Sequence, residues 1–322
     1  SRLTTGGTFI ASELEKRLAD FKHSESALVF NTGYMTNLGV LYGLLQTGDV
    51  VFSDELNHAS IIDGCRISRC KVVVYKHNDM ADLQRLLETE IVTGQRFIVT
   101  DGVFSMDGDI ADLPSLAVLK KQFNAFLIVD DAHGVGVIGN DGSGTASHYG
   151  LTDVIDLQVG TLSKALAAEG GYVAGKKILI DYLINRSRPF IFSTALAPAT
   201  LAAANAALLL LQTQASKYLD SLRANSRLMR RLLLEGGLNV VEGITPIIPV
   251  VIGEAGLTMQ FADRLKSKGI LVSGIRPPTV PRGESRLRIT VTAAHCEEQL
   301  RQAAQIITAL WQELKHGEKK EG

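Results

Sequence analysis

The chain has 322 residues, which is long enough for one large domain and a smaller one. Its 33 basic and 34 acidic residues nearly cancel, so the charge balance indicates neither a nucleic-acid partner nor an anionic membrane surface. A small anionic ligand must therefore be held by local groups.

The cysteines and the apolar stretches indicate a cytoplasmic protein. Cys65, Cys70 and Cys296 are odd in number and lack the spacing of metal ligands, which is typical of reduced thiols. The N-terminus has no basic-then-apolar signal pattern. The longest apolar stretch, residues 195–211, contains Pro198 and polar residues, so it predicts a buried helix and not a membrane span.

Short apolar runs alternate with longer amphipathic runs through the first 195 residues. Several short runs are continuously apolar, as in a mainly parallel sheet covered by helices on both faces. The sequence therefore predicts an α/β fold with three layers. The expected strands are Ala27–Phe30, Val50–Phe52, Val72–Tyr75, Phe97–Thr100, Phe126–Asp130 and Asp156–Val159. The expected helices are Met35–Leu45, Ile61–Ser68, Met80–Glu88 and Leu113–Gln122.

The pattern changes twice in the second half of the chain. It is helical throughout residues 196–235, and beyond Gly236 short strands return between helices, with a last helix expected over residues 297–314. We therefore expect a large domain of residues 1–195, a helical connector of residues 196–235 and a small α+β domain of residues 236–322.

The first candidate ligand-binding motif is Asn31-Thr32-Gly33-Tyr34, which links an expected strand to a helix. Free N–H groups and the helix dipole at such a junction suit a phosphate, although any strand–helix turn can carry a glycine. His58 also precedes an expected helix, where a lone histidine is more often structural than catalytic.

The segment Val129–Gly134 carries an acid and a histidine. Asp130 ends a buried strand, on the side where α/β proteins bind ligands, although aspartates there are also common helix caps. His133 follows three positions later and can point into the same crevice. No third ligand stands at helical or strand spacing nearby, so an organic cofactor fits this pair as well as a metal ion does.

Residues 134–139 match the dinucleotide pattern G-x-G-x-x-G. That fingerprint must open a helix, whereas residues 140–144 have the composition of a turn. We therefore reject a nicotinamide or flavin site here.

Lys164 lies in the segment Gly160–Leu166, between an apolar strand and a run of small residues, 167–175. Most lysines are solvated, but this setting predicts an enclosed one. Loss of hydration lowers the pKa of a lysine and makes it a usable nucleophile or base. The hydroxyls of Thr161 and Ser163 are close enough in sequence to suit a phosphate oxygen.

The last motif runs from residues 274–281, which are rich in proline, to residues 286–290. In an alternating strand Arg286 and Arg288 share one face, where a guanidinium can bind a carboxylate through two hydrogen bonds. A solvated edge strand is an equally good interpretation of these residues alone.

Together these motifs resemble the α-oxoamine synthase family of pyridoxal 5'-phosphate (PLP) enzymes across nearly the whole chain. The closest matches are residues 101–109, 129–134 and 275–295. The resemblance implies PLP fold type I, with PLP bound to the large domain and no metal. It also implies a homodimer with the active site at its interface, where residues 192–194 resemble a stretch that reaches the partner's phosphate.

The resemblance implies a role for each candidate residue. Lys164 would bind PLP covalently and later move the substrate Cα proton. Asp130 would pair with the pyridine nitrogen, so that the ring acts as an electron sink, and His133 would hydrogen-bond the ring hydroxyl. Among the other residues, His58 would stack on the ring and contact the substrate, Ser105 would lie close to the cofactor, and the phosphate would be bound by Gly33, Tyr34 and Thr161. Thr279 would line the substrate site, and Arg288 would bind the amino-acid carboxylate.

The implied activity is decarboxylative condensation of L-alanine with a pimeloyl thioester of CoA or acyl carrier protein, giving 8-amino-7-oxononanoate in biotin biosynthesis. One alternative is the reaction of 2-amino-3-ketobutyrate CoA ligase, which joins glycine and acetyl-CoA; residues 275–281 favour the first reaction. Another is a non-catalytic partner subunit, which Lys164 disfavours, and a third is an aminotransferase, which residues 286–295 disfavour. Family members carry a segment before the position of Ser1 that helps to cover the active site; a protein beginning at Ser1 is expected to close less well over its substrate.

Overall fold

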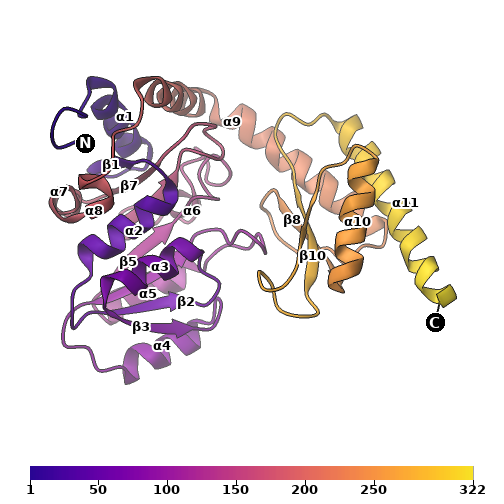
Figure 1. The fold of residues 1–322 in the computed structure, drawn as a ribbon, viewed down its shortest axis with the longest axis horizontal. Coiled ribbons are helices and arrows are strands. Elements are labelled where there is room, and N and C mark those ends of the chain that lie inside the picture. The colour runs from indigo at the N-terminus through magenta and orange to yellow at the C-terminus, as the bar shows by residue number, and fades with distance from the viewer. Residues whose placement is uncertain (322) are drawn as a thin grey trace. The chain divides into compact units, whose positions relative to one another are not determined.

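A computed structural model describes residues 1–321 of the chain (Figure 1). They divide into two compact units. The first contains residues 1–104 and 110–215, and the second contains residues 105–109 with the rest of the chain from Ser216. The expected division at residues 195 and 235 stays a prediction.

The first unit is built on a seven-stranded sheet with the strand order β1-β7-β6-β5-β4-β2-β3. Strands β2 to β6 are parallel, whereas β7 runs antiparallel to both of its neighbours. The sheet is therefore mainly parallel, as predicted. Its strands are β1 (Ser26–Phe30), β2 (Val50–Asp54), β3 (Lys71–Tyr75), β4 (Arg96–Asp101), β5 (Ala125–Asp130), β6 (Leu157–Thr161) and β7 (Gly171–Gly175).

Helices cover both faces of this sheet. Successive residues of a strand point to opposite faces, and in β1 Leu28 joins the core under α2, α3, α7 and α8, whereas Val29 joins the core under α1 and α9. Helices α4 and α5 pack over the rest of the second face. The helices of this unit are α1 (Phe9–Phe21), α2 (Gly33–Leu44), α3 (Ala59–Ser68), α4 (Met80–Thr89), α5 (Leu113–Gln122), α6 (Thr145–His148), α7 (Lys177–Arg186), α8 (Arg188–Ile191) and the first part of α9 (Pro198–Glu235).

Side-chain caps set where several of these helices begin. Thr8, Thr32, Asp79 and Asp112 each stand just before a helix, and each accepts a hydrogen bond from the backbone N–H three residues later. Such a cap satisfies one of the N–H groups that the first helical turn leaves open. These four residues therefore fix the register of α1, α2, α4 and α5.

The predicted strands and helices of the first unit are confirmed to within a few residues. The first unit also contains α1, α6, α7, α8 and β7, which were not among the expected elements. Helix α1 precedes the first predicted strand, and β7 occupies the run of small residues after Lys164. Glycine is required in β7, because a Cβ on Gly171 would stand 2.6 Å from the backbone nitrogen of Gly33. The small residues thus let a strand approach the start of α2.

Helix α9 passes from the first unit into the second. Its backbone leaves helical geometry at Gln214 (φ −133°, ψ 21°), next to the boundary between the two units. None of the helices within residues 1–321 is long and apolar enough to cross a bilayer.

The second unit is a small α+β structure. Its antiparallel sheet has the order β8-β10-β9, and its core includes Phe261 and Trp311, whose rings stack 5.7 Å apart. The segment 105–109 belongs to this unit, where Gly108 O accepts a hydrogen bond of 2.7 Å from the hydroxyl of Thr245. The elements are β8 (Ile247–Gly253), α10 (Ala255–Ser267), β9 (Ser273–Ile275), β10 (Ser285–Thr290), α11 (Glu297–Glu321) and the second part of α9.

Candidate cofactor-binding site

Two buried carboxyl groups stand side by side at the carboxyl ends of β4 and β5. Asp101 and Asp130 are paired in the register of the two strands and are 5% and 7% exposed. Thr161 ends the next strand, β6, at the same edge of the sheet. This edge is where ligands bind in α/β proteins.

Asp130 is held by hydrogen bonds to both of its carboxylate oxygens. Asn37 Nδ2 donates to Oδ2 at 2.6 Å, and Ala132 N–H donates to Oδ1 at 3.0 Å. Burial raises the pKa of Asp130 above its ordinary value, against the lowering effects of these bonds and of the charges of Lys164 and His58. A cationic partner would therefore stabilise the ionised form of this carboxyl group.

Asp101 stands in a still less favourable place for a negative charge. Burial, and then the charge of Asp130 beside it, raise the pKa of Asp101 well above its usual range. The backbone N–H of His58 donates to its carboxyl group at 3.2 Å. Two adjacent buried carboxyl groups do not both ionise readily, so this pair favours a proton or a cation nearby.

His58 is the N-cap of α3, which agrees with the structural interpretation of this residue. Ser60 donates its N–H to His58 Nδ1 at 3.2 Å, and Ser60 Oγ lies 2.7 Å from the same nitrogen. In neutral imidazole these bonds place the proton on Nε2. The ring itself is exposed, so the cap fixes its orientation and still leaves it accessible.

The start of α2 lies against Thr161. A Cβ on Gly33 would stand 3.3 Å from Thr161 Oγ1, and Thr161 Oγ1 lies 2.7 Å from Ser163 Oγ. Thr32 caps Met35, while the N–H groups at the first positions of a helix have no acceptor within it. The phenol of Tyr34 donates to Asp63 at 2.6 Å and is therefore already engaged. The group that Tyr34 offers at the start of α2 is its backbone N–H.

The structure corrects one expectation about Lys164. This residue lies in the bend between β6 and β7 and is exposed in the single chain, so the run of small residues does not enclose it. Those residues instead form β7, which packs on β1 and β6. The charge of Lys164 nevertheless lowers the pKa of both Asp101 and Asp130.

His133 lies in the turn that follows β5 and is half-buried. Turns, and not a helix, continue through residue 140, which agrees with the rejection of a dinucleotide site at residues 134–139. His133 therefore follows the buried acid Asp130 on the same turn.

These residues fit PLP. The buried carboxyl group of Asp130 suits a protonated ring nitrogen, and the start of α2 with the hydroxyl of Thr161 suits a phosphate. Lys164 lies three residues after Thr161 and carries the amine that, from the sequence resemblance, would bind PLP covalently.

Three other candidate residues, Ser105, Thr279 and Arg288, belong to the second unit. Arg288 donates to the backbone oxygen of Ser105 through Nε and to Thr290 Oγ1 at 3.1 Å through Nη1. Burial lowers the pKa of Arg288. Thr279 is exposed and follows Pro278.

The interpretation of residues 286–290 as a solvated edge strand is wrong, because β10 is the central strand of its sheet. Arg286 is 4% exposed and forms ion pairs with Asp107 and, at 3.0 Å, with Glu284. Its guanidinium is thus already paired with carboxylates, which leaves Arg288 as the better carboxylate anchor of the two.

Asn37, which was not predicted from the sequence, connects two parts of the site. Its amide donates both to Asp130 and, at 2.8 Å, to Ser60 Oγ, and Ser60 in turn contacts the ring of His58. A signal was present, since Asn37 is a buried amide in an otherwise apolar helix, one turn after Gly33.

Comparisons with known proteins agree with this geometry. A family model described as aminotransferase class I and II matches residues 1–307. A Lysinibacillus sphaericus protein named 8-amino-7-oxononanoate synthase is 51% identical over 300 residues, covering 93% of this chain and 77% of the relative. A solved structure of SPT (serine palmitoyltransferase) with PLP matches with a TM-score of 0.95 at 31% identity, covering 98% of this chain and 79% of that one. An 8-amino-7-oxononanoate synthase structure from Francisella tularensis matches with a TM-score of 0.81 at 31% identity, covering 96% and 88%.

The fold and the site thus define a PLP-dependent enzyme of fold type I, and PLP is its cofactor. The chain belongs to the aminotransferase class I and II family and, within it, to the α-oxoamine synthases, as the sequence resemblance implies.

Proposed function

We propose that the protein condenses L-alanine with a pimeloyl thioester, releasing carbon dioxide and the free thiol and giving 8-amino-7-oxononanoate for biotin biosynthesis. The observation that carries the PLP chemistry of this proposal is the buried pair Asp101 and Asp130 at the strand ends, whose pKa values the charge of Lys164 lowers. The name and 51% identity of the Lysinibacillus sphaericus relative support this reaction over the condensation of glycine with acetyl-CoA.

In this proposal the first unit holds the cofactor. Bound PLP supplies an electron sink for the substrate Cα. Asp130 keeps the ring nitrogen protonated, His133 hydrogen-bonds the ring hydroxyl, and the exposed ring of His58 stacks on the cofactor and lines the substrate site. Lys164 binds PLP and then moves the Cα proton.

The other proposed contacts hold the phosphate and the substrate. The N–H groups of Gly33 and Tyr34 and the hydroxyl of Thr161 bind the phosphate. Ser105 lies close to the cofactor and Thr279 lines the substrate site. Arg288 binds the amino-acid carboxylate, the group that leaves as carbon dioxide.

A product assay tests the proposed reaction. L-alanine, glycine and L-serine are each combined with pimeloyl and acetyl thioesters, the pimeloyl group being carried on CoA or on acyl carrier protein. We expect the highest kcat/KM for L-alanine with a pimeloyl thioester. Faster product formation from glycine and acetyl-CoA would contradict the proposal.

Borohydride reduction followed by peptide mapping tests the role of Lys164. We expect the pyridoxyl group on Lys164, and we expect Lys164→Ala to lose the absorbance band of lysine-bound PLP. Lys177→Ala is a matched control because Lys177 is exposed and its ammonium group pairs with Asp181 on its own helix. A pyridoxyl group on another lysine would overturn the assignment.

We infer that the active form is a homodimer in the cytoplasm. Lys164 is exposed in the single chain, and Phe192 in the segment 192–194 is 70% exposed, so a second chain has apolar surface to cover. Cys65, Cys70 and Cys296 are free thiols, which suits a reducing compartment.

A further inference from the structure

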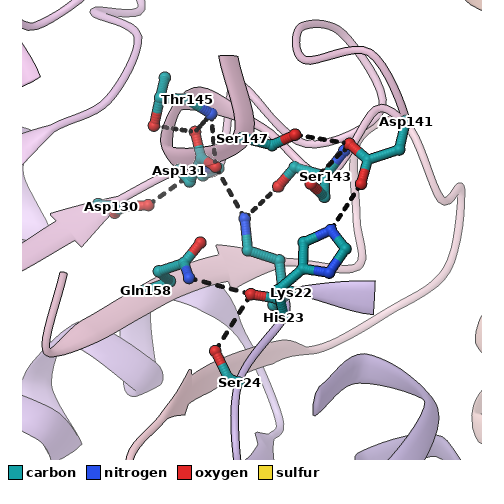
Figure 2. A network of polar contacts seen from close by, with 11 residues as sticks. Lys22, His23, Ser24, Asp130, Asp131, Asp141, Ser143, Thr145, Ser147 and Gln158 are labelled. Atoms are coloured by element: carbon teal, nitrogen blue, oxygen red, sulfur yellow. Dashed lines mark hydrogen bonds and ion pairs between the residues drawn. The ribbon is translucent and has the colours of Figure 1, made fainter. Parts of the chain in front are cut away.

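A buried ion pair joins Lys22 to Asp131, the residue that follows Asp130 at the end of β5 (Figure 2). Lys22 Nζ is 2.9 Å from Asp131 Oδ2, and the two side chains are 0% and 1% exposed. Lys22 is the residue that ends α1, and Asp131 directly follows Asp130. Burying two charges costs free energy, and none of the roles proposed above uses either of them.

The carboxylate of Asp131 is held from several sides. Thr145 donates its N–H at 3.0 Å to Oδ2 and its hydroxyl at 2.9 Å to Oδ1. A Cβ on Gly134 or Gly144 would stand 2.0 and 1.7 Å from the carboxylate oxygens, so the chain leaves room there only for this group. The backbone of Asp131 is fixed as well, since its N–H donates to Val159 O of β6 at 2.8 Å.

The ammonium group of Lys22 binds both ends of one loop. Besides Asp131 it donates to the backbone oxygen of Ser143, so residues 131–143 are closed at a single nitrogen. Asp141 strengthens the far end, accepting hydrogen bonds of 2.9 Å from Ser143 N–H and of 2.9 Å from the hydroxyl of Ser147 (Figure 2). The loop that contains His133 is thereby anchored to the end of α1.

We propose that Lys22 and Asp131 are positioning residues that set the place of the Asp130–His133 turn, and through it the fit of the protein to the ring of PLP. The proposal rests on the roles proposed for Asp130 and His133. Asp130 and Asp131 share a planar peptide group, so a displacement of the anchored residue moves the other. Small errors in the placement of groups that contact a cofactor reduce binding and turnover strongly.

A second ion pair in the same unit provides a matched control. Lys120 Nζ lies 2.7 Å from Asp156 Oδ2 and also donates to the backbone oxygen of Val154, and the side chains of the pair are 18% and 9% exposed. This pair has the same two-bond arrangement, but Asp156 precedes β6 and so lies at the opposite edge of the sheet from Asp130. Loss of either pair is expected to lower stability; only loss of the first is expected to affect PLP.

The experiment compares Lys22→Met with Lys120→Met in the PLP-loaded protein and in apoprotein prepared from it. We expect Lys22→Met to raise the Kd for PLP about tenfold and Lys120→Met to change it less than about twofold. Tenfold is the lower end of the loss in metal affinity that follows mutation of a residue that orients a metal ligand. The pH titration of the absorbance band of lysine-bound PLP should shift in Lys22→Met alone. Equal Kd values in the two variants at similar loss of Tm would overturn the proposal.

A double variant keeps the test decisive if Lys22→Met fails to fold. Lys22→Met with Asp131→Asn leaves no unpaired buried charge, so we expect it to fold. Its Kd for PLP should still be raised, because the amine that joins Asp131 to Ser143 is gone. A folded double variant that binds PLP like the parent and has the parent's band titration would show that the pair serves stability alone.

Asp130→Asn, measured in parallel, separates this proposal from the one on which it rests. If Asp130 contacts the ring nitrogen, its replacement shifts the titration of the PLP band. An unchanged band in Asp130→Asn together with a changed band in Lys22→Met would refute the role of Asp130 and would show that Lys22 acts through another residue of the turn. Changed bands in Asp130→Asn and Lys22→Met together support both proposals.

Discussion

At the scale of single residues, Asp101 and Asp130 are both buried at the strand ends, but their surroundings stabilise a negative charge to different degrees. Asp130 accepts hydrogen bonds from the Asn37 amide and the Ala132 N–H, whereas Asp101 receives the His58 N–H and the repulsion of its neighbour. This difference favours the negative charge on Asp130, the residue assigned to the ring nitrogen. Asp101 then supports the site as the more easily protonated partner.

The raised pKa of Asp101 predicts a pH-dependent stability of the apoprotein. An acid whose pKa is higher in the folded state holds its proton better there, so the folded state loses stability as the pH rises from the ordinary aspartate value of about 3.9 through the folded value. Asp101→Asn cannot ionise. As the pH rises above about 4, we therefore expect the free energy of unfolding of Asp101→Asn to increase relative to that of the parent. Urea unfolding across this range measures it. A constant difference between the two proteins would mean that Asp101 is ionised in both states.

Arg288 is the residue expected to govern amino-acid binding. Its guanidinium is partly buried and its Nε is bonded to Ser105 O, which orients the remaining N–H groups. We expect Arg288→Ala to weaken L-alanine binding by about 2–5 kcal/mol and Arg288→Lys to recover part of this, because an ammonium group lacks the planar pair of donors. The alanine-dependent spectral change of bound PLP gives the affinity.

Arg282→Ala controls for the loss of an arginine in the same unit, since Arg282 is exposed. The spectrum without alanine should stay the same in all three variants. If Arg288→Ala binds alanine as tightly as the parent, the carboxylate anchor is another residue.

At the scale of secondary-structure elements, the phosphate end of the site depends on how closely β7 approaches α2. Gly171 begins β7, and a Cβ there would meet Gly33 N at 2.6 Å and Thr36 Oγ1 at 2.4 Å. The first of these is backbone and cannot rotate away. The two elements that frame the expected phosphate site thus pack through a glycine.

Gly171→Ala is therefore expected to destabilise the protein by about 1–3 kcal/mol and to weaken PLP binding, because α2 must shift. Urea unfolding and the Kd for PLP measure the two effects. Gly7→Ala is the matched control, since a Cβ on Gly7 would be 3.4 Å from its nearest neighbour, an ordinary contact. A stable Gly171→Ala protein with normal PLP affinity would mean that the helix start does not hold the phosphate.

Local patterns predicted most of the sheet and part of the site, for physical reasons that differ. The strand ending at Asp130 was predicted because continuous apolar runs identify buried parallel strands. Strand β7 was missed because small residues carry no apolar pattern; the need for them comes from the close approach to Gly33. The partners Lys22 and Asp131 are 109 residues apart, and no local periodicity relates them.

At the scale of the whole molecule, the proposed site residues are divided between the two units. Most of the proposed cofactor residues, including Asp130, His133 and Lys164, come from the first unit, whereas Ser105, Thr279 and Arg288 come from the second. Residues 105–109 are an excursion of the chain from the first unit into the second, and α9 makes the later crossing beside Gln214.

The last prediction concerns assembly. A single chain of 34.7 kDa leaves Lys164 and Phe192 exposed, and we expect a dimer that covers them. Analytical ultracentrifugation at the absorbance of bound PLP should show the cofactor in the dimer and not in the monomer that appears on dilution. Burial of one phenylalanine contributes about 1.5–3 kcal/mol and a symmetric dimer contains two copies of Phe192, so Phe192→Ser should raise the dimer Kd by about two to four orders of magnitude. Ile91→Ser is the matched control, because Ile91 is 84% exposed and lies just beyond α4, away from the 192–194 segment in the sequence. A monomer that retains PLP and full turnover would show that the single chain completes its own site. A Phe192→Ser protein that dimerises like the Ile91→Ser control would show that Phe192 does not contribute to the interface.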